Sequence, residues 1–184
     1  MPSVADFLVS LLADPQTPLR VLLAFHIPAG LTCVITGAVA MLSQKRRGRH
    51  PRFGQIYYKA LAVVFVSAVG LAALRWPDDA YLLALGALAF ALASLGYIAR
   101  RIRWRGWTSA HIFGMGLSYV VMHTAFWVDN GPTLPLWNRL PVLAFWIAPS
   151  LIALPFFVLA FRHHTNVSND LRSTARQLVS ISRP

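Results

Sequence analysis

The chain alternates between five long runs of apolar residues and short polar segments. The runs cover residues 19–42, 56–74, 81–99, 108–128 and 140–161. A helix that crosses a bilayer needs about 20 mostly apolar residues, and each run is close to that length. The pattern therefore predicts an all-α fold, an integral membrane bundle of five transmembrane helices.

The composition indicates that the bilayer is the solvent for most of the chain. Of the 184 residues, 57% are hydrophobic and only 12% are charged, which is more apolar surface than a soluble core of this size could bury. The formal net charge of +11 would suggest nucleic acid in a soluble protein, but the basic residues stand in short blocks between the apolar runs. We therefore expect membrane lipids as partners and no nucleic acid. The single cysteine, Cys33, leaves neither a disulfide framework nor a cysteine-based metal site.

Basic residues are shared unequally between alternate polar segments. Most of the 17 lysines and arginines lie in segments 43–54 and 100–107 and in the tail, whereas the other side has only Arg20, Arg75 and Arg139. The positive-inside rule then predicts an N-terminus outside the cytoplasm and a C-terminus inside it. The chain divides into a short outer N-terminal segment (1–17), a transmembrane domain (18–162) and a basic cytoplasmic tail (163–184).

Histidines are the ionisable groups that recur within or beside the predicted spans. His26 and His123 are expected at similar depth near the outer face, while His111 and His50 are expected at one level near the cytoplasmic face, with His50 in the basic loop before the second span. Neutral imidazoles on two helices are what a transmembrane b-type cytochrome uses to bind haem iron. The sequence therefore predicts haem b or a transition metal held by some of four residues: His26, His50, His111 and His123 for haem, and His26, His50 and His111 for a bare ion.

Each of these features also has a purely structural interpretation. A histidine in a span is often only hydrogen-bonded across helices, and His111 and His123 point about 120° apart around one helix, given their spacing of twelve residues. Small residues of the first and fourth spans favour close helix packing, or else room for a flat cofactor. Asp129 is either a helix cap or a group that orients His26 or His123.

A basic cluster precedes the second span. Its arginines carry the charge to bind anionic lipid headgroups, and they are equally typical of a cytoplasmic loop. The cluster comprises Arg46, Arg47, Arg49 and Arg52.

Several motifs together resemble a family of uncharacterised bacterial multi-pass membrane proteins. They are His26, the segment Arg-His-Pro-Arg-Phe-Gly-Gln-Ile-Tyr at 49–57, His111, and the segment Thr-Ala-Phe-Trp-Val-Asp-Asn-Gly-Pro-Thr-Leu-Pro-Leu-Trp at 124–137. The resemblance covers most of residues 19–161 and implies a multi-pass protein of the bacterial cytoplasmic (inner) membrane, without an established activity. It fits His26, His50 and His111 better than His123. A fainter similarity, in helix count and histidine placement, is to four-helix b-type cytochromes.

Three classes of function remain open at this point. The first is a membrane protein with a histidine-based haem or metal site, used for electron transfer. The second is a non-catalytic accessory or assembly subunit of a larger membrane complex, or a homo-oligomer. The third is a small transporter or lipid-binding protein, which the low polarity of the spans makes least favoured. The chain lacks a Ser-His-Asp set, paired carboxylates and a phosphate-binding loop, so the sequence assigns no enzymatic class.

Overall fold

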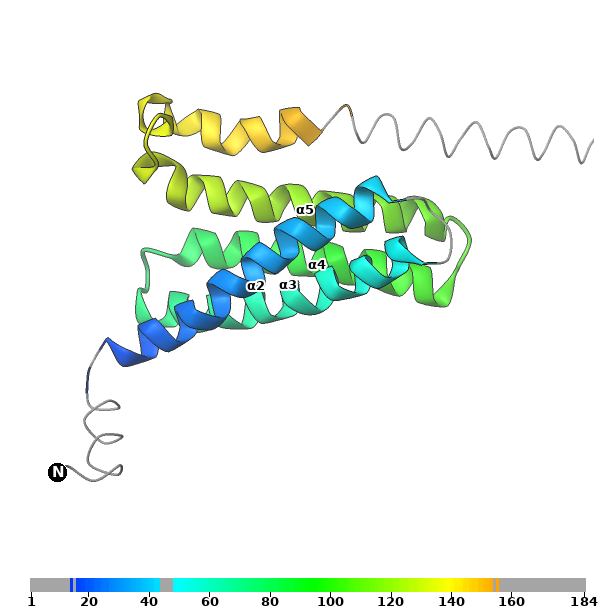
Figure 1. Ribbon diagram of the computed structural model, residues 1–184, viewed down its shortest axis with the longest axis horizontal. Coiled ribbons are helices and arrows are strands. Elements are labelled where there is room, and N and C mark those ends of the chain that lie inside the picture. Colours follow the sequence, from blue (N-terminus) through cyan, green and yellow to red (C-terminus); the bar gives the residue numbers. More distant parts are fainter. Residues whose placement is uncertain (1–13, 15, 44–47, 154, 156–184) are drawn as a thin grey trace, which may run out of the picture.

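The computed structural model describes residues 14, 16–43, 48–153 and 155, and over these residues the fold is all-α (Figure 1). The long helices are α2 (Thr17–Leu42), α3 (Arg49–Leu74), α4 (Ala80–Ile102) and α5 (Trp107–Asn130). Two 3₁₀ turns follow, η1 (Gly131–Thr133) and η2 (Trp137–Arg139). A shorter apolar helix, Val142–Ala153, comes next. The described part of the chain thus confirms the all-α prediction.

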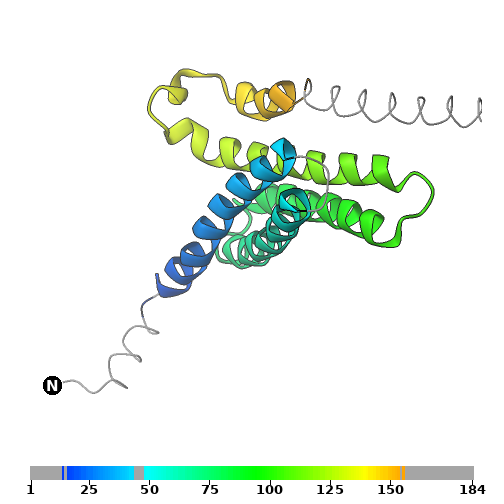
Figure 2. The same ribbon diagram turned by 45° about the vertical axis from the view of Figure 1, so that its right-hand side comes forward.

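The four long helices form two antiparallel hairpins. α2 packs along α3, α4 packs along α5, and contact between α3 and α4 joins the two hairpins. The bundle has two ends (Figure 1). At one end, which we call the hairpin end, α2 and α4 finish and α3 and α5 begin. At the opposite end, which we call the turn end, lie residues 75–79, η1 and η2. Figure 2 shows that α2 crosses the other helices obliquely.

Three of the helices, α2, α3 and α4, are long and apolar enough to cross a membrane. α5 has a suitable length, 24 residues, but interrupts its apolar residues with polar ones such as His111, Ser118 and His123. The helix Val142–Ala153 covers only part of the fifth predicted span, whose remaining residues mostly lie outside the described part of the chain. Five helices are therefore present in the described residues, and three of them have the character of spans.

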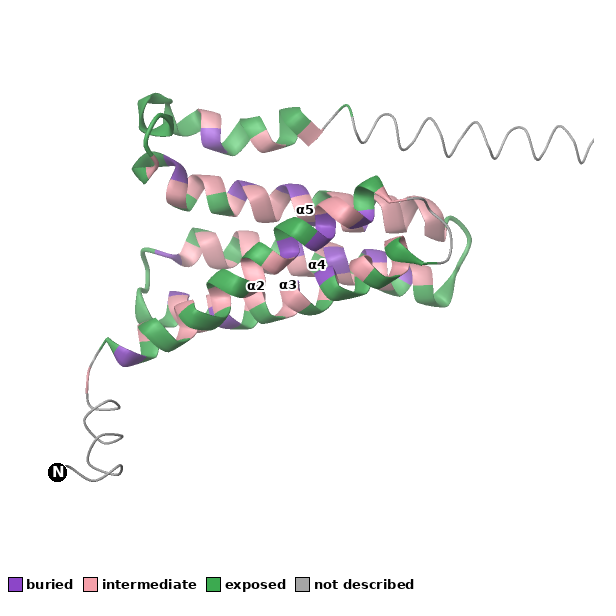
Figure 3. Cartoon of the chain, viewed as in Figure 1, coloured by how far each residue is buried: buried purple, intermediate pink, exposed green. Residues whose placement is uncertain are grey.

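The outward faces of the bundle are strongly apolar. Large side chains such as Phe25, Ile27 and Val66 are more than 60% exposed. Figure 3 shows exposed and half-buried residues along every helix, with buried residues sparse among them. An apolar exterior around a small, partly polar interior is what lipid as solvent requires.

Small residues permit the closest helix contacts. A Cβ added at Gly114 of α5 would meet the main chain of Gly96 of α4, with the amide nitrogen at 2.6 Å and the Cα at 2.8 Å. The two backbones therefore touch at this point, as the packing interpretation of the small residues of the fourth span expected. At Gly37 of α2, the position that an added Cβ would take is occupied by the ring of Tyr119.

Two helix boundaries differ from the sequence expectation. α3 begins at Arg49 instead of residue 56, so His50 lies in the first helical turn and not in a loop. Pro51 does not prevent this, because a proline in the first turn gives up only an N–H that has no helical partner. α4 likewise continues to Ile102 and includes Arg100 and Arg101 in its last turn, where positive charge complements the helix dipole.

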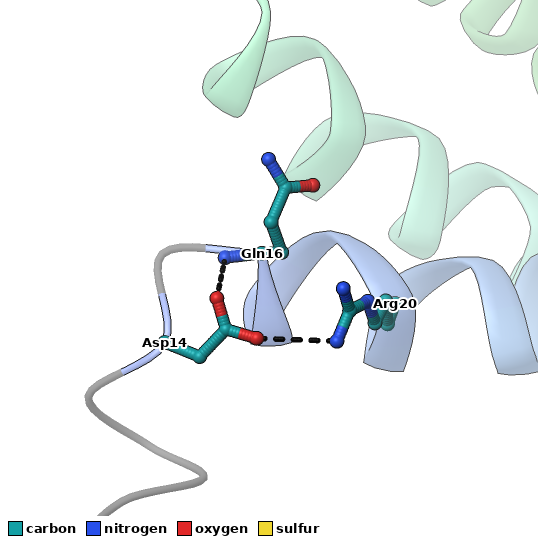
Figure 4. A network of polar contacts seen from close by, with 3 residues as sticks. All are labelled: Asp14, Gln16 and Arg20. Atoms are coloured by element: carbon teal, nitrogen blue, oxygen red, sulfur yellow. Dashed lines mark hydrogen bonds and ion pairs between the residues drawn. The ribbon is translucent and has the colours of Figure 1, made fainter.

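The start of α2 is held by Asp14. One carboxylate oxygen accepts a hydrogen bond of 3.0 Å from the amide of Gln16, and the other forms an ion pair of 3.1 Å with Arg20 (Figure 4). Both contacts are exposed, so they add little stability. They do place the beginning of α2 at Thr17, two residues before the predicted span.

Candidate functional site

His50 and His111 lie together at the hairpin end of the bundle. Their ring centroids are 6.1 Å apart and the ring planes are nearly perpendicular, at 83°. Each hairpin contributes one ring, since His50 begins α3 and His111 lies in the early part of α5. The expectation that these two residues share one level agrees with this geometry. We call them the His50–His111 pair.

Main-chain carbonyls orient both rings. His50 Nδ1 lies 2.8 Å from the carbonyl oxygen of Ala40, and His111 Nδ1 lies 2.8 Å from that of Gly96. A carbonyl oxygen only accepts, so Nδ1 is the donating nitrogen in both rings. In a neutral ring of this tautomer, Nε2 carries the basic lone pair. Metal-binding histidines usually have this arrangement, with the far nitrogen donating to a carbonyl or carboxylate.

The local sequence explains one of these bonds as a helix cap. Ala40 lies in the last turn of α2, where carbonyls have no helical N–H to accept from, and His50 supplies one. Gly96, in contrast, lies inside α4, where the helix already provides a partner for its carbonyl. The bond from His111 is therefore an additional one on the second lone pair of that oxygen.

A buried hydrogen bond lies deeper along the same seam between α3 and α5. Tyr57 follows His50 by seven residues and Ser118 follows His111 by seven, so both lie about two helical turns, roughly 10 Å, further from the hairpin end. The Tyr57 hydroxyl is 2.9 Å from Ser118 Oγ, and the two residues are 2% and 0% exposed. This hydrogen bond therefore joins α3 to α5 in the buried interior next to the His50–His111 pair.

His26 and His123 have separate partners. His26 Nδ1 lies 2.9 Å from Ser67 Oγ of α3. The single hydroxyl proton of Ser67 is directed toward the carbonyls of Val63 and Val64, at 2.8 and 3.0 Å, so the hydroxyl oxygen accepts from His26. His123 Nδ1 donates to the carbonyl of Tyr119 in its own helix, at 2.9 Å. The structure thus gives His26 a role in joining α2 to α3 and His123 a bond within α5. Their pairing on one iron or metal ion stays a prediction.

A polar group also lies at the turn end. Asp79 is 8% exposed and forms an ion pair of 3.5 Å with Arg75. Asp129, which follows the predicted span 108–128, lies within electrostatic range of Asp79, Arg75 and His26. Partial burial, and then the Asp79 carboxylate, raise the pKa of Asp129 above its usual value. In the alternative interpretation Asp129 orients His26 or His123, and of these two His26 has an electrostatic interaction with Asp129.

The described residues contain no cluster of three or more His, Cys, Asp or Glu side chains arranged to hold a metal ion. Cys33 is fully buried, and its thiol is directed at the carbonyl of Tyr57, 3.8 Å away. A metal ion at the His50–His111 pair would therefore take its further ligands from other side chains, from water or from a porphyrin.

Two of the four expected headgroup-binding arginines are visible. Arg49 and Arg52 are exposed in the first turn of α3, beside His50, whereas Arg46 and Arg47 lie outside the described residues. Their position at the hairpin end is compatible with contact to anionic lipids.

Sequence reasoning did not find the serine and tyrosine partners of these sites. Ser67, Ser118 and Tyr57 are buried polar residues in apolar runs, and their seven-residue spacing from His50 and His111 was the available signal for two of them. Carbonyl partners such as Ala40 and Gly96 leave no trace in a sequence.

Comparison of the chain with family models, with curated proteins and with solved structures finds no match.

Proposed function

We propose that this is a multi-pass membrane protein that binds a transition-metal ion, or haem iron, through His50 and His111. His50 and His111 would hold the metal, and electron transfer is the chemistry that such a centre would supply. The observation that carries the proposal is the geometry of the His50–His111 pair: two rings from two hairpins, each held through Nδ1, at a separation that suits one metal.

The ring separation can be compared with metal coordination. A metal–nitrogen bond is about 2.1 Å long and a ring nitrogen lies about 1.1 Å from its centroid, so two imidazoles on one ion have centroids about 5 to 6.5 Å apart. The observed 6.1 Å falls in this range. It lies toward the upper limit, so the two rings would stand wide apart on the ion and leave room for a further ligand or a porphyrin.

The proposal includes a topology. Five spans with the N-terminus outside and the C-terminus in the cytoplasm, in a bacterial inner membrane, would put the His50–His111 pair near the cytoplasmic face. Support comes from the excess of basic residues on the same side as the hairpin end, including the exposed Arg49, Arg52 and Arg105.

The test is metal and haem analysis of the purified full chain. Protein from cells supplied with haem and transition metals should carry about one metal or one haem per chain, the latter visible as a Soret band. His50→Asn and His111→Asn should lose it, because asparagine can still donate to Ala40 or Gly96 but offers no nitrogen at the Nε2 position. His123→Asn is the matched control and should keep it.

Two results would overturn the proposal. One is wild-type protein with neither metal nor haem after such growth. The other is equal metal content in the His50, His111 and His123 variants.

A second candidate is a non-catalytic accessory subunit of a larger membrane complex. The observation that favours it is the apolar exposed face of the helix Val142–Ala153, where Val142, Leu143 and Ile152 are each more than 60% exposed. Co-purification of a defined membrane complex with a metal-free chain would support this function instead.

A further inference from the structure

We propose that Met115 supplies a thioether ligand beside the His50–His111 pair, and that the resulting site selects copper(I). This inference rests on the proposed function, since it names the ion that the pair binds.

Met115 occupies the right helical position. It follows His111 by four residues, so the two side chains share one face of α5. Side chains on a helix lean toward its N-terminus and cover the preceding turn, which for Met115 is the turn of His111. Met115 is partly buried, and its side chain packs against the core formed by Cys33, Tyr57, Leu61 and Ala93.

Contacts with α4 place Met115 at the same point as the anchor of His111. The carbonyl of Gly96 accepts the His111 Nδ1 proton at 2.8 Å. A Cβ added at Gly96 would meet Met115 N at 2.8 Å and Met115 Cγ at 2.9 Å. The start of the methionine side chain thus fills the space over Gly96, and its three rotatable bonds give the sulfur reach toward the imidazole.

Ligand chemistry favours copper(I) over zinc. Imidazole binds both metals, whereas a thioether is a soft ligand that selects copper(I). The distribution of carboxylates also favours copper(I). Those among the described residues all lie at the turn end, away from the His50–His111 pair: Asp14, Asp78, Asp79 and Asp129. Three neutral ligands leave the charge of the ion uncompensated, and a monovalent ion costs far less to bury than a divalent one.

The experiment compares two matched methionine variants of the full chain in detergent. Leucine replaces methionine with little change in volume, so both variants should fold and melt like the wild type. Met115→Leu removes the proposed ligand. Met122→Leu is the control, because Met122 lies on the same face of α5 seven residues further from the hairpin end. Copper(I) affinity is measured anaerobically by competition with a chromogenic chelator, and zinc(II) affinity by a parallel competition.

Met115→Leu should weaken copper(I) binding at least about tenfold, the lower limit for loss of a group that supports a metal site, and leave zinc(II) affinity unchanged. Met122→Leu should change neither affinity. Equal copper(I) affinity in the wild type and Met115→Leu would overturn the inference while leaving the proposed function intact, provided that His50→Asn and His111→Asn still lose metal. Failure of the wild type to bind any metal or haem would overturn both.

Discussion

At the scale of single residues, the four described histidines share one feature. His26, His50, His111 and His123 each use Nδ1 to bond a serine hydroxyl or a main-chain carbonyl. An imidazole in an apolar environment needs such a partner, because leaving its N–H unpaired is costly. Among these four, the His50–His111 pair is distinguished by the proximity of a second imidazole, whereas the ring beside His123 is that of Tyr119.

Asp129 gives a prediction about pH. Its pKa is raised in the folded protein, by partial burial and then by Asp79, so folding favours the protonated carboxyl. Its contribution to stability is therefore most favourable below the usual carboxyl pKa and becomes less favourable as the pH rises through the raised value. Asp129→Asn, which is uncharged at every pH, should melt higher than the wild type near about pH 7.5 and much like it near about pH 4.

Thermal melting in detergent, followed by circular dichroism, measures this difference. Asp78→Asn, at an exposed position on the same end, removes the same charge and should change the melting temperature little at either pH. A wild type that is more stable than Asp129→Asn near neutral pH would show that the attraction of Arg75 and His26 outweighs the cost of burial.

At the residue scale, the positions of the two histidines could be predicted from the sequence, but their hydrogen-bond partners could not. The common level of His50 and His111 could be inferred because both stand at the same side of their apolar runs. The bonds to Ala40 and Gly96 could not, since every residue has a carbonyl. The bond from His123 Nδ1 to the carbonyl of Tyr119 in its own helix was likewise not predictable, and the pairing of His123 with His26 stays a prediction.

At the scale of helices, the α4–α5 contact depends on two glycines that leave no room for a side chain. A Cβ at Gly114 would meet Leu92 O at 2.5 Å and the main chain of Gly96, none of which can rotate away. Gly114→Ala should therefore cost about 1–3 kcal/mol, as overpacking usually does. Gly30 in α2 has nothing within 4 Å of its added Cβ, so Gly30→Ala should stabilise the protein by about 0.5–1 kcal/mol through helix propensity.

Reversible unfolding in mixed detergent micelles compares the two variants directly, because both make the same chemical change in the middle of a helix. Similar free energies of unfolding for Gly114→Ala and Gly30→Ala would contradict the close backbone contact between α4 and α5.

The apolar runs predicted the helix bounds closely, except where a helix continues into polar residues. α2 and α4 begin within two residues of the predicted runs, and α3 ends at the predicted Leu74. The first turns of α3 were missed because most of residues 49–55 are basic, polar, proline or glycine, with Phe53 the one strongly apolar side chain. Hydropathy does not register a helix that extends beyond the hydrocarbon. The oblique crossing of α2 in Figure 2 depends on side-chain packing that no periodicity reveals.

At the scale of the whole molecule, orientation in the membrane is the property to test. A reporter active only in the cytoplasm should give signal when fused after Pro184 or inserted beside Gly48, and none when inserted beside Thr133. An external signal from the fusion after Pro184 would contradict the topology with five spans. An external signal beside Gly48 together with a cytoplasmic one beside Thr133 would invert it.

The division into two hairpins has a consequence for the order of biosynthesis. Residues 17–74 can close their own contact, with His50 bonded to Ala40, as soon as α3 has left the ribosome. α4 and α5 form their own backbone contact later, with Gly96 against Gly114. The two imidazoles meet only after the second hairpin has packed beside the first. If His50 and His111 bind an ion as proposed, its loading is a late maturation step, because an unfinished chain carries only one of the two rings.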